Sequence, residues 1–113
     1  MNRQKRHRRE ATMVLLLAAA LGVLALPARA QTGGEALYKS KCAVCHGADA
    51  KGETTVGKAN QVRDLGSADV QKQTDEQLAA IIRNGKGKMP AYAKSLKPEQ
   101  IKDLVTYIRS LKK

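Results

Sequence analysis

The residues best suited to chemistry form one short motif, Cys42-Ala43-Val44-Cys45-His46. A disulfide is one interpretation, because an exported chain meets oxidising conditions. A zinc site would need four ligands, and residues 31–113 hold only these two Cys and one His. A thioredoxin-like redox pair would need a strand–helix context and no following His. In the fourth interpretation, both thiols add to the vinyl groups of one porphyrin, and the adjacent His lies beneath its iron.

Covalent haem attachment accounts for more of the motif than the other three interpretations do. It uses both thiols, and it gives a role to His46, the only His outside residues 1–30. It also suits an exported chain, since haem of this kind is attached outside the cytoplasm. We therefore predict that Cys42 and Cys45 bind one haem c covalently and that His46 is the fifth ligand of its iron.

Met89 is the candidate for the sixth iron ligand, because the other two Met lie in residues 1–30. It sits in a polar, glycine-rich segment that starts at Gly85 and ends at Pro90. Met is usually a core filler, but no apolar stripe surrounds this one. We expect the glycines to let the backbone approach a flat cofactor. Lys86, Lys88 or an open sixth position stay as alternatives.

Residues 1–30 resemble a removable export signal. A basic segment precedes an apolar run over residues 11–26, and Ala28-Arg29-Ala30 provides small residues where a signal peptidase cuts. The run has 16 residues, whereas a membrane span needs about 20. We expect cleavage after Ala30, a working domain of residues 31–113 and a periplasmic location. An uncleaved signal that anchors the chain is the alternative.

Composition limits what the working domain can be. Of the 113 residues and net charge of +11, residues 1–30 account for +5, which leaves 83 residues and +6. The chain has three Tyr but no Phe and no Trp, so side chains alone supply little bulk for a core. Acidic residues are interleaved with the basic ones, which argues against nucleic-acid binding. A multidomain protein is excluded by length.

Three amphipathic helices are expected to position the motif and Met89. The first begins at Thr32, in a capping-box arrangement with Glu35, and runs to the Cys motif. The second begins at Thr74 and stops at Asn84-Gly85. The third begins at Pro98 and carries an apolar stripe that ends at Leu111. A short helical turn is expected within residues 67–73, and no pattern predicts a sheet.

With these motifs, residues 33–111 resemble the class I c-type cytochromes of the small bacterial kind. The resemblance implies an all-α, cytochrome c-like fold with three to four helices around one covalently bound haem. In that family the first and last helices cross, with a small residue and an aromatic on one helix facing an aliphatic and an aromatic on the other. Gly34 and Tyr38, facing Leu104 and Tyr107, match this pattern.

The sequence departs from that family at one point. Related cytochromes often have a Pro-containing loop after the haem-binding motif, whose backbone carbonyl accepts a hydrogen bond from the ligand His. No Pro occurs between Pro27 and Pro90 here. Some group must still orient His46, because the second ring nitrogen of a ligand His is normally hydrogen-bonded. We expect a carbonyl within residues 54–58 to take this role.

The ligand set and the resemblance together predict a soluble one-electron carrier and not an enzyme. A thioether ligand and apolar surroundings should both favour ferrous iron and raise its potential. The side chains expected around the haem are apolar: Leu37, Leu65, Leu78, Ile82, Leu96 and Leu104. Two alternatives remain, namely a gas-binding or peroxide-reducing protein with an open sixth position, and an electron-entry subunit tethered to a membrane oxidase.

Redox donor and acceptor proteins are the expected partners of a monomeric carrier, with membrane contact only through them. Such partners bind fast and weakly through surface charge. Four Lys lie near the motif or the Met89 segment, at Lys41, Lys86, Lys88 and Lys94. They predict acidic docking faces on the partners, although exposed Lys residues are common on any surface.

Overall fold

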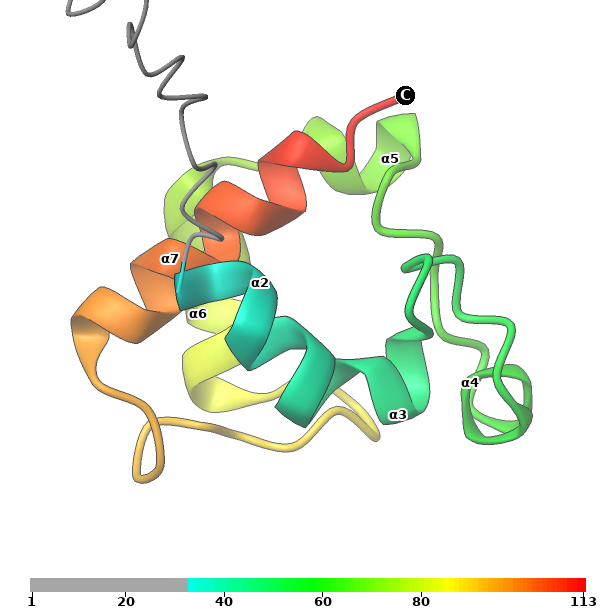
Figure 1. The fold of residues 1–113 in the computed structure, drawn as a ribbon, viewed down its shortest axis with the longest axis horizontal. Coiled ribbons are helices and arrows are strands. Elements are labelled where there is room, and N and C mark those ends of the chain that lie inside the picture. The colour runs from blue at the N-terminus through cyan, green and yellow to red at the C-terminus, as the bar shows by residue number, and fades with distance from the viewer. Residues whose placement is uncertain (1–32) are drawn as a thin grey trace, which may run out of the picture.

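The computed structural model describes residues 33–113, so the expected signal and Thr32 lie outside the described residues (Figure 1). No strand occurs within this range, and one isolated bridge pairs Lys86 with Met89. The elements are α2 (Gly33–Leu37), the π-helical η1 (Tyr38–Cys42), α3 (Ala43–His46), α4 (Thr55–Ala59), α5 (Ala68–Gln71), α6 (Asp75–Asn84) and α7 (Pro98–Ser110).

The predicted all-α fold is confirmed, with two short helices beside the three expected ones. α2, η1 and α3 follow one another without a break and together form the first expected helix. α6 and α7 are the second and third, and α5 is the expected turn within residues 67–73. α4 was not expected from the sequence, and it is capped by the Thr54 hydroxyl, which accepts from the backbone N–H of Gly57 at 2.8 Å.

Local signals explain where the longer helices begin and end. α6 begins at the expected Thr74 with a capping box, because Thr74 and Gln77 exchange side-chain-to-backbone hydrogen bonds. Gly85 ends this helix with a φ of +75°, and its N–H donates to the Ile81 carbonyl at 2.8 Å. α7 has Pro98 at its first position, and the Gln100 side chain accepts from the backbone N–H of residue 97 at 2.9 Å.

The expected crossing of the first and last helices is confirmed (Figure 1). Gly34 of α2 lies so close to α7 that an added Cβ would stand 2.1 Å from the Asp103 carbonyl oxygen. One turn further along, the Tyr38 and Tyr107 rings pack with their centroids 5.0 Å apart and a tilt of 47°. Leu104 completes the crossing and is only 1% exposed.

A polar clamp joins α5 and the start of α6 to α7. Arg109 of α7 donates from Nε to the Asp75 carboxylate at 2.7 Å, and from its two terminal nitrogens to the carbonyls of Gln71 and Gln73. The Gln71 amide in turn donates to the Ile108 carbonyl at 2.8 Å. These bonds satisfy carbonyls at the end of a short helix, which would otherwise lack partners.

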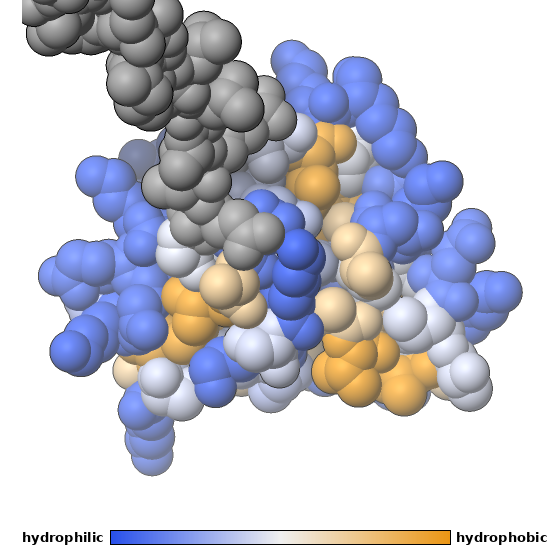
Figure 2. Space-filling model, in the orientation of Figure 1, coloured by the Kyte–Doolittle hydropathy of each residue, from blue (hydrophilic) through white to orange (hydrophobic). Residues whose placement is uncertain are grey.

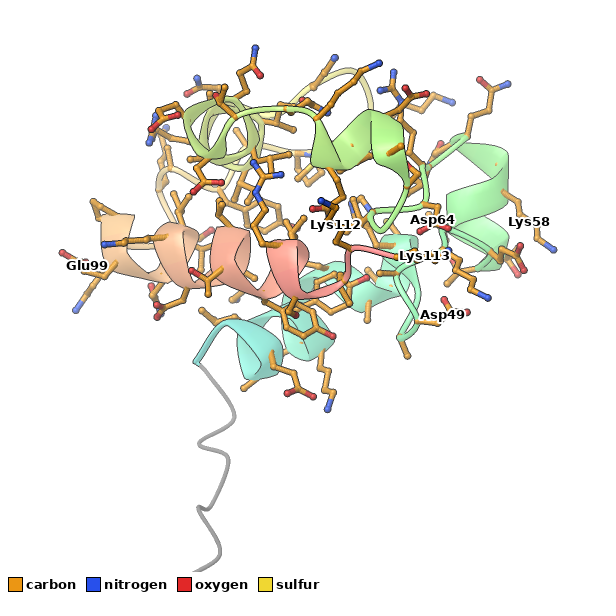
Figure 3. All side chains as sticks on the ribbon, turned by 90° about the horizontal axis from the view of Figure 1, so that it is seen from above. Asp49, Lys58, Asp64, Glu99, Lys112 and Lys113 are labelled. Carbon is orange, nitrogen blue, oxygen red and sulfur yellow. The ribbon has the colours of Figure 1, made fainter. Side chains whose placement is uncertain are left out.

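The C-terminus is fixed to the loop that leads into α5. Lys113 forms an ion pair with Asp64, and Figure 3 shows the two side chains next to each other. The backbone N–H of Lys113 also donates to the Gly66 carbonyl at 3.5 Å. α7 is therefore held by the loop before α5, by α5 itself and by α2, so its position depends on most of the chain.

We predict that Gly34→Ala will strongly destabilise the haem-loaded protein. The added methyl group has no room beside the Asp103 carbonyl, so α2 and α7 must move apart, and the free energy of unfolding should fall by at least about 2 kcal/mol. Gly33→Ala is the matched control, because a Cβ there meets only the Asp103 side chain, at 3.5 Å. Denaturant unfolding measures both variants, and equal losses would contradict the role of the crossing.

Candidate functional site

A cavity of about 390 Å³ brings the four predicted site residues together. Cys42, Cys45 and His46 line it from the end of the first helical segment. Met89 lines it from the loop between α6 and α7, far away in the sequence. Residues of α6 and α7, the two longest helices within residues 33–113, also line the cavity, in a domain that has no Phe or Trp side chain to fill it.

The cavity walls are mostly apolar, and five of the six predicted apolar residues line them: Leu65, Leu78, Ile82, Leu96 and Leu104. The prediction for Leu37 is wrong, since this residue does not line the cavity and is half-buried against the core elsewhere. Consecutive helical residues differ by about 100° in direction. The neighbouring Tyr38 lines the cavity, so Leu37 faces another side.

Several wall residues were missed by the sequence analysis. Val70 and Ile108 lie on helices, where the apolar periodicity of α7 could have indicated Ile108. Val62 lies in an irregular segment between α4 and α5, where no periodic pattern exists to indicate it. Tyr92 lies in the loop after Met89 and lines the cavity with its half-buried ring.

The two thiols stand on one side of a helical turn, because residues three apart share a helix face. Both are free and half-buried. Burial raises the pKa of the Cys42 thiol to about 11, with a smaller opposing effect from the nearby Lys41. Both thiols line the same apolar cavity, so a single group held there could be attached to both of them.

His46 is the last residue of α3, and the turn that follows fixes its backbone. Gly47 ends the helix with a φ of +82°, and the backbone N–H of Gly52 donates to the His46 carbonyl at 2.8 Å. Burial lowers the pKa of the imidazole, which favours the neutral form that binds metals.

The predicted hydrogen bond that orients His46 is not present among the described residues. The Nδ1 atom is buried and has no partner, so no carbonyl of residues 54–58 accepts from it. The segment contacts the motif in another way, because the Thr54 hydroxyl donates to the Cys45 carbonyl at 3.0 Å. Thr54 therefore ties the loop to the backbone next to His46 and not to the ring itself.

A tight turn carries Met89. The backbone N–H of Lys86 donates to the Met89 carbonyl at 3.1 Å, and the N–H of Met89 donates to the Lys86 carbonyl at 3.0 Å. Gly87 has a φ of +56° and Gly85 a φ of +75°, which are positions that favour glycine. The glycines therefore form the turn itself, and a Cβ on Gly85 would also lie 2.7 Å from the Met89 carbonyl.

Three of the four predicted docking lysines surround the cavity. Lys41, Lys86 and Lys88 line it, but Lys94 does not. Exposed apolar side chains are few, and within residues 33–113 the large ones are Val44, 67% exposed, and Val56, 42% exposed. Figure 2 shows the corresponding pattern on one face, where small apolar areas lie between hydrophilic side chains.

The residues around the cavity fit a covalently attached haem. Two thiols, a neutral imidazole with an unpartnered nitrogen, and a thioether converge on one apolar space. Groups of three or more His, Cys, Asp or Glu that could hold a bare metal ion do not occur in the part of the chain that the structure describes. Within that part, no helix has the length and apolar character to cross a membrane.

The chain is similar in sequence to known cytochromes. Residues 29–108 match the family model described as "Cytochrome C oxidase, cbb3-type, subunit III". The chain is 36% identical to cytochrome c6 of Gloeothece citriformis over 66% of either chain, and 32% identical to that of Aphanizomenon flos-aquae over 66% of this chain and 83% of that one. It thus spans just under two thirds of the first of these relatives.

Two further matches extend this picture. The cbb3-type cytochrome c oxidase subunit CcoP of Rubrivivax gelatinosus is 42% identical over 62% of this chain, but only over 22% of its own length. The solved structure of the KustC0563 c-type cytochrome superposes with a TM-score of 0.66 at 34% identity, covering 71% of this chain and 98% of that one. The chain therefore belongs to the c-type cytochrome family that the matching model describes, as a small mono-haem class I cytochrome with covalently bound haem c and its iron.

Proposed function

We propose that the protein is a one-electron carrier in which Cys42 and Cys45 attach the haem, and His46 and Met89 are the axial ligands. One observation carries this proposal: a single apolar cavity is lined by all four side chains, although Met89 lies far from the other three in the sequence. When bound, haem c supplies an iron that changes between the ferric and ferrous states. The chain supplies ligands, apolar walls and a surface for partners.

Met89 is favoured over the neighbouring lysines by its burial. Its side chain is half-buried and packs against the hydrophobic core, whereas Lys86 and Lys88 are exposed. A thioether is a soft ligand that stabilises ferrous iron, and the apolar walls disfavour the extra charge of ferric iron. Both effects raise the reduction potential, which suits a carrier that accepts electrons readily.

Met89 also favours a carrier over an enzyme. Gas binding or peroxide reduction requires an open or labile sixth position. A turn closed by two backbone hydrogen bonds presents Met89 to the cavity, and such a preformed loop supports a ligand that stays in place. The chain also has no second His outside residues 1–30 to act as a general base.

Export and cleavage after Ala30 are proposed on the sequence pattern, and residues 31–113 would then work in the periplasm. The family match begins at residue 29, close to this boundary. The second candidate is a tethered subunit that passes electrons to a membrane oxidase. The similarity to the oxidase subunit CcoP favours that candidate, and an uncleaved signal would provide the tether.

Surface charge is proposed to guide redox partners to the cavity. Lys41, Lys86 and Lys88 place positive charge around it, so a partner with an acidic face would approach from that side. Exposed Val44 also lines the cavity and offers such a partner an apolar contact. We expect a monomer that binds neither nucleic acid nor a membrane directly.

Intact mass after expression with haem-maturation machinery tests attachment and cleavage together. We expect the mass of residues 31–113 plus one haem. Cys42→Ala combined with Cys45→Ala should lose the haem mass, and circular dichroism should show a largely unfolded chain, because side chains do not fill the cavity. A full-length mass would favour the tethered subunit, and a compact haem-free double variant would contradict the structural role of the haem.

Met89→Leu tests the sixth ligand. The side-chain volume is nearly conserved, so packing should cost less than about 1.5 kcal/mol, but the thioether is lost. We expect the thioether–iron charge-transfer band of the oxidised protein to disappear, the potential to fall, and carbon monoxide to bind the reduced protein rapidly and stoichiometrically. Lys86→Ala and Lys88→Ala are controls that should keep the band. Rapid carbon monoxide binding by the unaltered protein would favour the gas-binding alternative.

Charge reversal tests the docking surface. Lys41→Glu, Lys86→Glu and Lys88→Glu should each slow electron transfer to an acidic partner several-fold at about 0.01 M ionic strength, where the Debye length is about 30 Å. At about 1 M salt the difference should vanish. Lys94→Glu changes the net charge equally but does not line the cavity. Stopped-flow rates that fall equally for Lys94→Glu would refute a localised docking surface.

A further inference from the structure

The Tyr92 hydroxyl makes a hydrogen bond that has no role in the proposed attachment and ligation of the haem. It donates a hydrogen bond of 3.3 Å to the backbone carbonyl of Lys41, 51 residues earlier. Lys41 belongs to η1, one residue before Cys42. Within residues 33–113, no other hydrogen bond joins residues 85–96 to the helical segment 33–46. We call these the Met89 loop and the attachment helix.

Within residues 33–113, the other hydrogen bonds of the Met89 loop are made within its own turns and to α6. At its start, the N–H of Gly85 donates to the Ile81 carbonyl at 2.8 Å, and further along the N–H of Tyr92 donates to the Ile82 carbonyl at 3.0 Å. Both bonds go to the end of α6, so hydrogen bonding fixes the Met89 loop mainly to that one helix. The hydroxyl of Tyr92 adds a hydrogen bond from this loop to the attachment helix.

The backbone of Tyr92 is well placed to transmit that connection. Its N–H is bonded to α6, and its carbonyl accepts from the N–H of Leu96 at 2.9 Å, so the residue cannot shift without breaking these bonds. Its ring is half-buried, packs against the core and lines the cavity beside Met89. The hydrogen bond of the hydroxyl therefore restrains the loop close to Met89, the proposed ligand.

We propose that Tyr92 is a positioning residue whose hydroxyl latches the Met89 loop to the attachment helix and thereby limits how often Met89 leaves the iron. The inference rests on the proposed ligation by Met89. It adds that the stability of this ligation depends partly on the hydrogen bond between the Tyr92 phenol and the Lys41 carbonyl.

The chemistry of the contact suits a latch that opens occasionally. Burial raises the pKa of the Tyr92 phenol, so the hydroxyl keeps its proton and stays a donor through neutral and mildly alkaline pH. The bond is long and exposed, and a neutral hydrogen bond contributes only modestly to stability. Its loss should raise the opening constant of the loop about two- to tenfold.

Tyr92→Phe in the haem-loaded protein tests the latch, since it removes the hydroxyl and keeps the ring. We expect cyanide, used as a probe of ligand exchange, to bind the oxidised variant about two- to tenfold faster. The backbone amides of Lys86 and Met89 should exchange with deuterium faster by a similar factor, whereas those of α7 should not change. The amide readout reports loop opening independently of the iron.

Tyr107→Phe is the matched control. It removes a phenolic hydroxyl from a half-buried ring that does not line the cavity and for which the described residues show no hydroxyl hydrogen bond. It should leave the cyanide rate and the loop amides unchanged. Equal behaviour of Tyr92→Phe and the unaltered protein would overturn the latch, as would acceleration by Tyr107→Phe to the same extent.

The same samples separate this inference from the proposed ligation. If the unaltered oxidised protein lacks the thioether–iron band and binds cyanide at once, Met89 is not the ligand and the latch has nothing to hold. If the band is present and Tyr92→Phe changes neither the cyanide rate nor amide exchange, the ligation stands and the latch is refuted. Acceleration of the α7 amides along with the loop would indicate general destabilisation and would also refute it.

Discussion

Contact between two backbones at Gly34 and Asp103 is the constraint on which the rest of the structure depends. It lets α2 and α7 cross at a distance that no residue with a side chain would permit. The crossing buries Tyr38 together with Leu104, and the same continuous helical segment leads on through η1 to Cys42 and Cys45. Tyr38 and both cysteines line the cavity, so the segment that the crossing holds also carries the two thiols.

The cavity shows how so small a domain obtains an interior. Its helices bury a modest set of aliphatic side chains and only one fully buried aromatic, Tyr38. A chain of this size buries a smaller fraction of its surface than a larger domain does, so a large apolar group in the interior would contribute to folding as well as to function. Binding such a group only in the folded state stabilises that state. Attachment of the haem would therefore also stabilise the fold of this protein.

The attachment helix and the Met89 loop differ in how many hydrogen bonds and contacts fix them to the remaining structure. The attachment helix is fixed by the crossing and by the Tyr38 hydroxyl, which donates to the Gly47 carbonyl at 2.7 Å. The Arg109 clamp fixes α5 and α6 against α7 in a comparable way. Met89 instead lies on a loop whose turn is closed by hydrogen bonds, but which makes few hydrogen bonds to the remaining structure. Local openings occur where such ties are few, which makes this loop the place where ligand exchange would start.

Much of the site was determined by sequence alone. Spacing of Cys42, Cys45 and His46 is local, and so are the caps and glycines that begin and end helices, because each depends on neighbours within a few residues. Elimination left one Met outside residues 1–30, and the structure brings it to the same cavity. Only tertiary structure decided that Leu37 faces away, that Lys94 stands off the cavity, and that a phenol joins the two sides. These facts depend on the angles between elements distant in the chain, which no local pattern encodes.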